Sequence, residues 1–531
     1  MLSTFRQSMT WLHTWCGLVV GWVLFAIFFS GTLAVFRHEI DYWMAPELHV
    51  AMDTDSAVTV GQQVLQQVAP TATRWVIDLP TNRTPVLRVR WQADPKQRFQ
   101  SRSIDSAGHD LAPRETRGGS MIYRFHYGLL LGTTGMWIVG GMAMAMLVAL
   151  VSGVIIHAKI FREFFTFRPT RPAPRAWLDA HTVSSVAVLP FALMITYSGL
   201  VIWWFIWLPG GLDLAYGGER AALFRDMAPA GFSRVAPSKE QAPLADLSQI
   251  LQQAKEAAPG GLAIATVVVT APGMANAQVE MTRISENALW GAGDRLRFDG
   301  VSGVLSERLP EQGAPAFVAH RVIRILHELK FAGPWLRWVF FAMAAVSCAM
   351  IATGTVLWGS KRRVKHVKSF AAGGVTRRGA MAAFGVDAMN AGVIAGLCTA
   401  TGVYFIANRL LPVTMTGRAD TEVTIFFVSW LCCACAAIVY LMMLHRRFAT
   451  LDGAQTMLRR LWGLQWAFAA AVALAILPLD AITTAGISGA IARGDLIVLS
   501  FLASVVVAAI AMAWVAYMGL RPLPVLRGRR S

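Results

Sequence analysis

Four histidines lie in or beside strongly apolar stretches of this 531-residue chain: His13, His126, His181 and His327. An ionisable side chain inside a membrane segment is costly and usually functional. A zinc site would need further cysteine or carboxylate ligands, and the repeated pattern of these histidines includes none. Two facing imidazoles between apolar helices suit the axial ligation of a b-type haem iron instead. For any one of them taken alone, a hydrogen-bonded packing residue is the alternative.

The spacing of the histidines repeats along the chain. His13 precedes Ser30 by 17 residues, His181 precedes Ser198 by the same interval, and a glycine follows each serine. His13 and His181 are expected near the cytoplasmic ends of their helices, where they would form an inner pair of ligands.

His126 and His327 repeat in the same way, because each precedes a glycine by six residues. They are expected near the external ends of their helices as an outer pair. A helix rises about 1.5 Å per residue, so positions 20 residues apart lie about 30 Å apart along it. The two pairs should therefore lie near opposite membrane faces and bind about two haems, without covalent attachment because no Cys-x-x-Cys-His is present.

His157 complicates the inner pair. It ends the second apolar run, and Trp358 occupies the equivalent position in the other copy of the repeat. His157 could replace His13 or His181 as the inner ligand, contact a haem propionate or lie at the membrane interface. The remaining histidines are not expected to be ligands: His38, His49, His109, His320, His366 and His445.

Basic side chains flank the outer pair. Arg124 precedes His126 by two residues, and Arg324 and Lys330 stand three residues on either side of His327. They are expected to contact haem propionates or an anionic substrate, unless they only reach toward the lipid headgroups. No residue is predicted to be catalytic in its own right.

The composition excludes a soluble enzyme. Only 15% of the residues are charged and 55% are hydrophobic, whereas soluble proteins carry about a quarter charged residues. All six cysteines lie within apolar runs, so no disulfide framework is expected. Eight apolar runs are long enough to cross a bilayer: about 12–36, 133–157, 180–207, 335–358, 385–408, 423–444, 461–479 and 496–519.

The net charge of +17 is distributed as in a membrane protein rather than a nucleic-acid-binding protein. Basic residues gather after the second, fourth, sixth and eighth runs, and the other connections carry most of the acids. By the positive-inside rule, both termini are cytoplasmic and the long insertions are external. No nucleic-acid partner is expected.

The predicted fold is an all-α integral membrane protein of about eight transmembrane helices with two small external α+β modules. Residues 1–175 and 176–368 are interpreted as two copies of one helix–module–helix unit, an arrangement that places functional sites at the repeat interface. The predicted segments are transmembrane helices at 1–36, 126–158, 180–208 and 320–359; external modules at 37–125 and 209–319; basic cytoplasmic loops at 159–179 and 360–384; a four-helix transmembrane extension at 385–519; and a cytoplasmic tail at 520–531.

Each external module is predicted as one helix followed by three short strands. Both are too small to bury a large core, so they should pack on the membrane bundle or on each other. The helices are expected at 58–68 and 244–257, and the strands at 74–79, 85–91, 98–104, 263–270, 277–282 and 294–298.

Five segments around the histidines resemble those of the PepSY-associated transmembrane helix proteins, which occur in bacterial inner membranes and are often linked to iron uptake. The resemblance covers about residues 1–368, and its segments follow one another in the order of that family. They are WLHTWCGL at 11–18, FHYGLLLG at 125–132, SGVIIHAKIFREFF at 152–165, WLDAH at 177–181 and LHELKFAG at 326–333.

The resemblance implies PepSY-like periplasmic modules, b-type haem and reduction of a ferric siderophore at the periplasmic face of the inner membrane. Carried over position by position, it makes His13, His126, His181 and His327 the haem-ligand candidates. It does not cover residues 385–519, which are expected to bury few charges and could form a quinone-facing bundle, a partner-docking bundle or an inert extension. Their main polar points are Asp387, Asn390 and Asn408.

The predicted activity is transmembrane electron transfer that reduces a ferric siderophore or another periplasmic acceptor. No Gly-x-Gly-x-x-Gly fingerprint opens a helix after a strand, so the electrons are expected from quinol or from a donor protein. One alternative is a transporter of a metal or chelate, which predicts a polar or acidic midplane cavity. The other is a non-enzymatic regulatory or binding membrane protein with structural histidines.

Overall fold

The computed structural model describes residues 4–50, 54–157, 173–227, 235–257, 263–284, 295–309, 315–374, 377–443 and 451–521. The chain forms two compact units. The helical unit contains Met1–Met44, Glu115–Tyr197 and Phe340–Ser531, and the sheet unit contains Ala45–Arg114 and Ser198–Val339.

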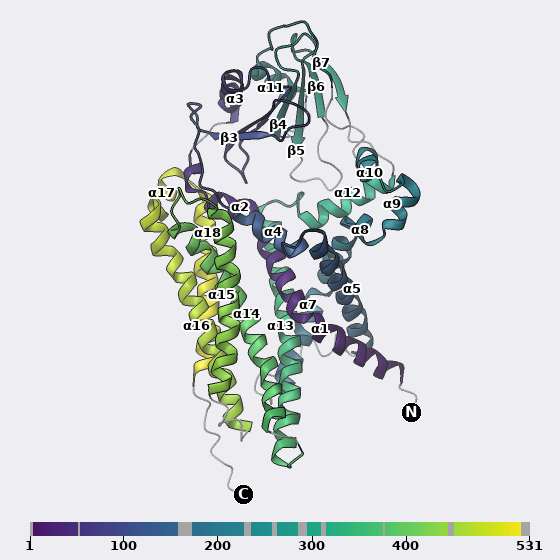
Figure 1. Cartoon of the computed structure of the whole chain (residues 1–531), viewed down its shortest axis with the longest axis vertical. Helices are drawn as coiled ribbons and strands as arrows, with labels where there is room; N and C mark the ends of the chain where they lie inside the picture. The colour runs from purple at the N-terminus through teal and green to yellow at the C-terminus, as the bar shows by residue number, and fades with distance from the viewer. Residues whose placement is uncertain are drawn as a thin grey trace. The chain divides into compact units, whose positions relative to one another are not determined.

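Long apolar helices dominate the helical unit (Figure 1). Without water in the hydrocarbon core, a helix is the way for a single segment to satisfy its own backbone hydrogen bonds. The helices that lie wholly or mostly in this unit are α1 (Phe5–Ala34), α2 (Arg37–Trp43), α4 (Gly118–Gly128), α5 (Gly132–Ile156), α7 (Ala173–Ile202), α13 (Pro334–Ala371), α14 (Arg377–Leu410), α15 (Arg418–Met443), α16 (Leu451–Thr483), α17 (Gly486–Arg493) and α18 (Leu496–Leu520).

Among the described helices, seven are long and apolar enough to cross a membrane: α5, α7, α13, α14, α15, α16 and α18. Helix α1 makes an eighth span if its halves Phe5–Gly17 and Val20–Ala34, which meet at 60°, cross together. The chain is therefore a multi-pass membrane protein with seven to eight candidate spans in its described part. The second to eighth predicted runs each overlap one of the seven helices.

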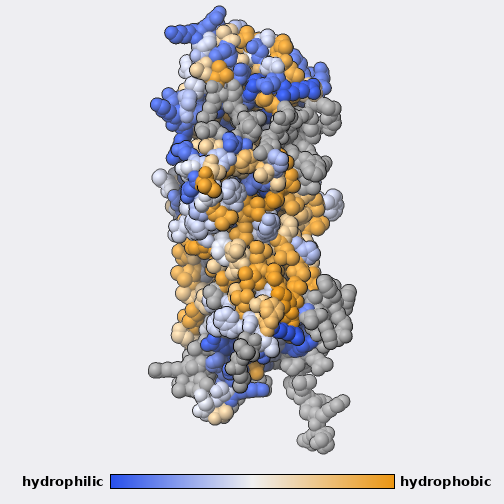
Figure 2. Space-filling view, turned by 90° about the vertical axis from the view of Figure 1, so that its right-hand side faces the viewer, coloured by the Kyte–Doolittle hydropathy of each residue, from blue (hydrophilic) through white to orange (hydrophobic). Residues whose placement is uncertain are grey.

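The surface of the long helices is apolar, as contact with lipid requires. Val507, Leu431 and Trp514 are 68%, 64% and 64% exposed, although each is a large hydrophobic residue. Figure 2 shows the hydrophobic residues gathered in a broad zone on one face of the molecule.

The C-terminal helices bury more charge than the sequence pattern indicated. Besides Asp387, the side chains of Arg409, Arg418, Glu422 and Asp480 are all at most 5% exposed. The expectation of few buried charges was wrong because Arg409 and Arg418 lie near the ends of their helices, where a sequence pattern assigns a charge to the interface. Each of these arginines is paired with a carboxylate, Arg409 with Asp480 and Arg418 with Glu422.

The sheet unit contains seven antiparallel strands in the order β3-β2-β1-β4-β5-β6-β7. The strands are β1 (Arg74–Asp78), β2 (Leu87–Gln92), β3 (Gln100–Ile104), β4 (Ala263–Thr270), β5 (Gln278–Ile284), β6 (Arg295–Asp299) and β7 (Leu305–Leu309). Its helices are η1 (Pro46–Leu48), α3 (Thr54–Val68), α8 (Trp204–Trp207), α9 (Pro209–Tyr216), α10 (Arg220–Met227), α11 (Leu247–Glu256) and α12 (Pro315–Glu328).

Both insertions contribute to this one sheet. Strand β1 of the first insertion pairs with β4 of the second, with Val76 opposite Val268. Of the two packing arrangements that the sequence left open for the modules, the structure has them packed on each other. The helix and three strands predicted in each insertion are present, and β7 is an additional strand that the pattern did not predict.

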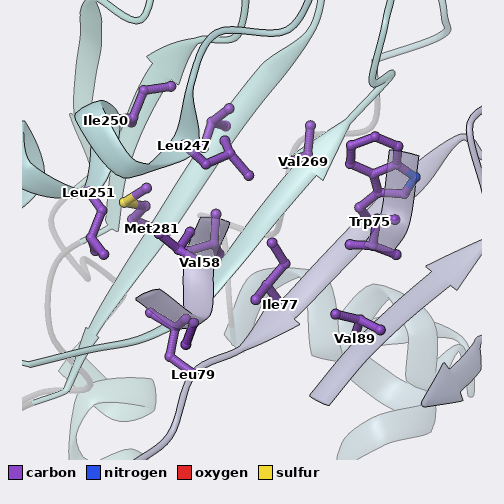
Figure 3. Close-up of a cluster of buried hydrophobic side chains, with 14 of the residues drawn as sticks. Val58, Trp75, Ile77, Leu79, Val89, Leu247, Ile250, Leu251, Val269 and Met281 are labelled. Atoms are coloured by element: carbon purple, nitrogen blue, oxygen red, sulfur yellow. The ribbon is translucent and has the colours of Figure 1, made fainter. Parts of the chain in front are cut away.

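A single hydrophobic core joins the two insertions (Figure 3). In this cluster four side chains are fully buried: Ile77 and Val89 from the first insertion, and Val269 and Met281 from the second. The side chain of Gln62 on α3 donates to the Ala245 carbonyl at 3.2 Å and accepts from the Leu247 amide at 2.9 Å, which ties α3 to the start of α11. The insertions therefore share one core.

Because of this shared core, Ile77→Ala should destabilise both insertions at once. Ile77 is fully buried, and removing its side chain should cost about 2–5 kcal/mol of unfolding free energy. Hydrogen exchange measured on the whole protein should become faster in β2 and in β5 alike. Val304→Ala, at a position that is 62% exposed, is the control. Faster exchange confined to residues 74–104 would contradict the shared core.

Candidate functional site

His13 on α1 and His181 on α7 face each other in the helical unit. Their ring centroids are 6.3 Å apart, and the ring planes are inclined at 59°. The Nδ1 of His13 bonds the Ala149 carbonyl at 2.8 Å, and the Nδ1 of His181 bonds the Met350 carbonyl at 2.9 Å. A carbonyl only accepts, so both Nδ1 atoms are donors, and in the neutral imidazole Nε2 keeps its lone pair.

The separation of the two rings suits a shared metal ion. A metal–imidazole bond is about 2 Å long and a ring centroid lies about 1 Å from its nitrogen, so two rings on one ion have centroids about 6 Å apart. Ligating histidines generally donate their other ring N–H to a carbonyl or carboxylate, which fixes the ring. His13 and His181 satisfy both conditions.

A glycine of the neighbouring helix makes room for each ring. A Cβ atom placed on Gly153 would lie 3.2 Å from His13 Cε1, and one on Gly354 would lie 3.1 Å from His181 Cε1. Serine or threonine precedes both glycines.

The other two candidate histidines have the same surroundings, each in its own unit. His126 on α4 belongs to the helical unit; its Nδ1 donates to the Ile27 carbonyl at 2.8 Å, and a Cβ on Gly31 would lie 2.7 Å from its ring. In the sheet unit, a Cβ on Gly199 would lie 3.1 Å from the Cε1 of His327.

A serine hydroxyl lies beside the ring of His327. Its Nδ1 lies 2.8 Å from the hydroxyl oxygen of Ser198, the residue that precedes Gly199. His13 also has a hydroxyl nearby, that of Ser152, at 3.3 Å from its Nδ1. The hydroxyls are thus part of the local hydrogen bonding of two of the four histidines.

The glycines also determine which carbonyl is open to the ring. Ala149, Ile27 and Met350 each precede the corresponding glycine by four residues. The Cβ of a helical residue points toward the N-terminus, over the preceding turn. A glycine leaves the second lone pair of that carbonyl accessible, so one residue provides both the space and the acceptor.

His157 ends α5 and lies one turn after Gly153. It is the C-cap residue, and its amide donates to the Gly153 carbonyl at 3.3 Å. The close ring pair is formed by His13 and His181. His320 shows the opposite pattern to the candidate ligands, since its Nε2 lies 3.2 Å from the Ile202 carbonyl.

The three basic side chains predicted beside the outer pair differ in their partners. Arg324 and Lys330 both pair with Glu328, at 2.8 and 2.7 Å. Burial opposes ionisation of Glu328, but Lys330 and Arg324 outweigh it and lower the pKa of this carboxyl. Arg124 is exposed on α4 and makes no ion pair within the described part of the chain.

Helices α1 and α5 line an apolar groove that includes Ser152, whose hydroxyl lies 3.3 Å from the Nδ1 of His13. Its volume is about 270 Å³, and it is lined by Met9 and Leu12 of α1 and by Leu147, Val148, Val151 and Ser152 of α5. Within the described ranges, no three His, Cys, Asp or Glu side chains come close enough together to hold a metal ion. The arrangement therefore offers paired imidazoles rather than a multi-ligand metal site.

Sequence reasoning found the four histidines but missed the groups that hold them. The serine–glycine and threonine–glycine pairs were visible as markers of the repeat. The available signal was that each candidate histidine is followed, 17 or 26 residues later, by one such pair. In the structure each ring lies against the glycine of a pair on another helix.

These features define a multi-pass membrane protein with histidines fixed between its helices. The chain belongs to the PepSY-associated TM region family, whose sequence model matches residues 10–361. It is similar to the uncharacterized protein PA4219 of Pseudomonas aeruginosa, with 26% identity over 256 residues. That match covers 46% of this chain and 63% of the relative, so the chain spans less than two thirds of the relative's length.

The contact between Gly31 and His126 predicts opposite effects for two glycine-to-alanine changes. Gly31→Ala should lower the unfolding free energy by about 1–3 kcal/mol, because the new methyl group meets a ring that is already hydrogen bonded. Gly141→Ala on α5 is the matched control, since nothing lies within 4 Å of its Cβ position. That change should be neutral or stabilising because alanine favours helix. Thermal unfolding of the purified protein compares them, and equal stability of the two variants would refute the contact.

Proposed function

We infer that this protein is a di-haem b-type electron-transfer protein of the bacterial inner membrane that reduces a ferric siderophore on the periplasmic side. The observation that carries the proposal is the His13–His181 pair. The rings are 6.3 Å apart, and each Nδ1 is occupied by a carbonyl. This arrangement suits one iron between two Nε2 atoms.

The geometry of His13 and His181 supports b-type haem at the proposed inner site. His13 and His181 would be the inner ligands, and His126 and His327 the outer ligands, with His157 a candidate contact beside the inner site. The Nδ1 atoms of His13, His126 and His181 donate to backbone carbonyls, which hold these rings in place. Bound haem would supply one-electron redox chemistry, and its axial ligands and burial would set the potential.

The helices would hold the ligands in place and exclude water. A carbonyl at Nδ1 fixes the tautomer and raises the basicity of the ligand.

The proposed reaction is the one-electron reduction of chelated Fe(III) to Fe(II). Oxygen-rich chelators suit the harder ferric ion, so reduction would release the iron. A quinol, oxidised to quinone with loss of two electrons and two protons, would serve two ferric ions; a donor protein is the alternative source. Arg124, exposed two residues before His126, would attract an anionic chelate or pair with a propionate, and Arg324 and Lys330 would do so in exchange for Glu328.

The proposed orientation follows from charge. The basic connections at 159–179 and 360–384 and the tail at 520–531 would be cytoplasmic. Both termini would then be cytoplasmic, and the insertions that form the sheet unit would be PepSY-like periplasmic modules.

No specific observation favours either alternative, a transporter or a regulatory membrane protein. A transporter needs accessible polar groups, but Asp387, Glu422 and Asp480 are each buried and paired with an arginine. In a purely regulatory protein the histidines would be structural, and the Nδ1 bonds alone would suffice for that. The proximity of two imidazoles in an apolar bundle favours the redox proposal over it.

A reduced-minus-oxidised spectrum tests the proposal. Protein purified from haem-replete cells should show reducible Soret and α bands with about two haems per chain, and the reduced protein should be reoxidised by a ferric hydroxamate chelate. His181→Ala should remove about half of the haem, because one axial ligand is lost at the inner site alone.

His320→Ala is the matched control, because His320 is also a buried histidine bonded to a carbonyl, but through Nε2. It should retain both haems. Wild-type protein without haem would end the proposal. Haem that is reducible but inert toward ferric chelates would confine it to electron transfer with another acceptor.

A further inference from the structure

The C-terminal helices contact the two chain segments that flank Ala45–Arg114, the first part of the sheet unit, in the sequence. Arg409, at the end of α14, donates to the Trp43 carbonyl at 2.7 Å, and its guanidinium lies 3.9 Å from the centroid of the Trp43 ring. Arg418, at the start of α15, donates to the Glu115 carbonyl at 2.9 Å. Trp43 ends α2 two residues before Ala45, and Glu115 is the first residue of the helical unit after Arg114.

Thr116 connects the second of these segments to a buried carboxylate. Its hydroxyl donates to Glu422 at 2.6 Å and accepts from the Gly118 amide at 3.1 Å. Glu422 also accepts from Asn408 at 2.9 Å and from Arg418 at 2.5 Å. We call Thr116, Asn408, Arg418 and Glu422 the Glu422 cluster.

The Glu422 cluster lies at the first turn of α4. The Thr116 hydroxyl bonds the first amide of this helix, and the Tyr404 hydroxyl of α14 donates to the Gly118 carbonyl at 3.0 Å. From the other side, Asp41 of α2 accepts from the amide and the hydroxyl of Ser120. The start of α4 is therefore fixed by both α2 and the C-terminal helices.

Close approach of α2 to α4 depends on glycine. A Cβ on Gly118 would collide with the Asp41 carboxylate, and a Cβ on Gly119 would collide with the Arg37 carbonyl. Gly118 also has a φ of +54°, which disfavours other residues. The first turn of α4 therefore has a defined position, and any displacement of it would move the whole short helix.

Helix α4 carries His126 eight residues after Gly118, about 12 Å along the helix axis. Arg418 and Glu422 are both 0% exposed, and a buried ion pair adds little net stability because desolvation offsets the attraction. The role of this ion pair is therefore better explained by the position that it imposes on its neighbours. The contacts of Thr116 and Tyr404 with Gly118 fix the start of α4, the helix that carries His126.

We propose that the C-terminal helices position the outer haem ligand: the Glu422 cluster fixes the first turn of α4 and, through it, His126. This rests on the proposed function for the role of His126, but the fixation of α4 does not depend on haem. Glu422, Arg418 and Thr116 are thus positioning residues, and the extension at 385–519 supports the redox site.

Thr116→Val in the full-length protein tests the proposal by two measurements. Losing a hydrogen bond to a charged, buried acceptor should make amide exchange in residues 118–128 about tenfold faster or more, with α5 little changed. In the haem-loaded protein, His126→Ala identifies which component of the redox titration and of the electron paramagnetic resonance spectrum belongs to the outer haem. In Thr116→Val that component should shift, while the other component should not. Thr116→Ser should restore both.

Gln465→Leu is the matched control, because it removes a buried hydrogen bond between α16 and α15, from Gln465 to the Cys433 carbonyl at 3.0 Å. It should lower stability without moving the His126-dependent signal. Unchanged exchange in α4 of Thr116→Val, or an equal spectral shift in Gln465→Leu, overturns the proposal. If the wild type binds no haem, the proposed function fails and the exchange result alone decides whether the cluster fixes α4.

Discussion

An imidazole held inside a membrane needs a fixed acceptor for its Nδ1–H, and here helix carbonyls supply that acceptor. Such a carbonyl is already bonded within its helix, and its second lone pair is normally covered by the side chain four residues later. Gly31, Gly153 and Gly354 remove that side chain. One glycine therefore gives each of these three rings both its space and its carbonyl acceptor. Because Nδ1 is held by the carbonyl, the direction of Nε2 is fixed as well.

The two insertions meet at one pair of strands in the sheet unit. Strand β1 is the first strand of its insertion and β4 is the first of the other, and the two pair antiparallel with Val76 opposite Val268. Joining at these strands removes one exposed edge from each module, and both modules contribute to one hydrophobic core.

Local patterns predicted much of this structure, and long-range contacts account for what they missed. The histidine spacing and the apolar runs are local, so His13, His181 and the seven spans could be located from sequence. The β1–β4 pairing joins Val76 to a residue almost 200 positions later, and no alternation of side chains specifies such a partner. The Nδ1 acceptors are backbone atoms, which leave no direct trace in the sequence beyond the glycines that expose them.

The buried charges of the C-terminal helices show why burial must be considered together with location. An arginine near the end of an apolar helix, such as Arg409 or Arg418, has the sequence signature of a residue that reaches the headgroups. In the structure both are covered, and each donates to a carbonyl on a segment beside the first insertion. A helix that only contacts lipid does not need buried arginines. The carboxylates of Asp480 and Glu422 neutralise the charges of Arg409 and Arg418. Neutralisation does not explain their additional bonds to backbone carbonyls. These bonds connect the C-terminal helices to the end of α2 and to Glu115, three residues before the start of the helix that carries His126.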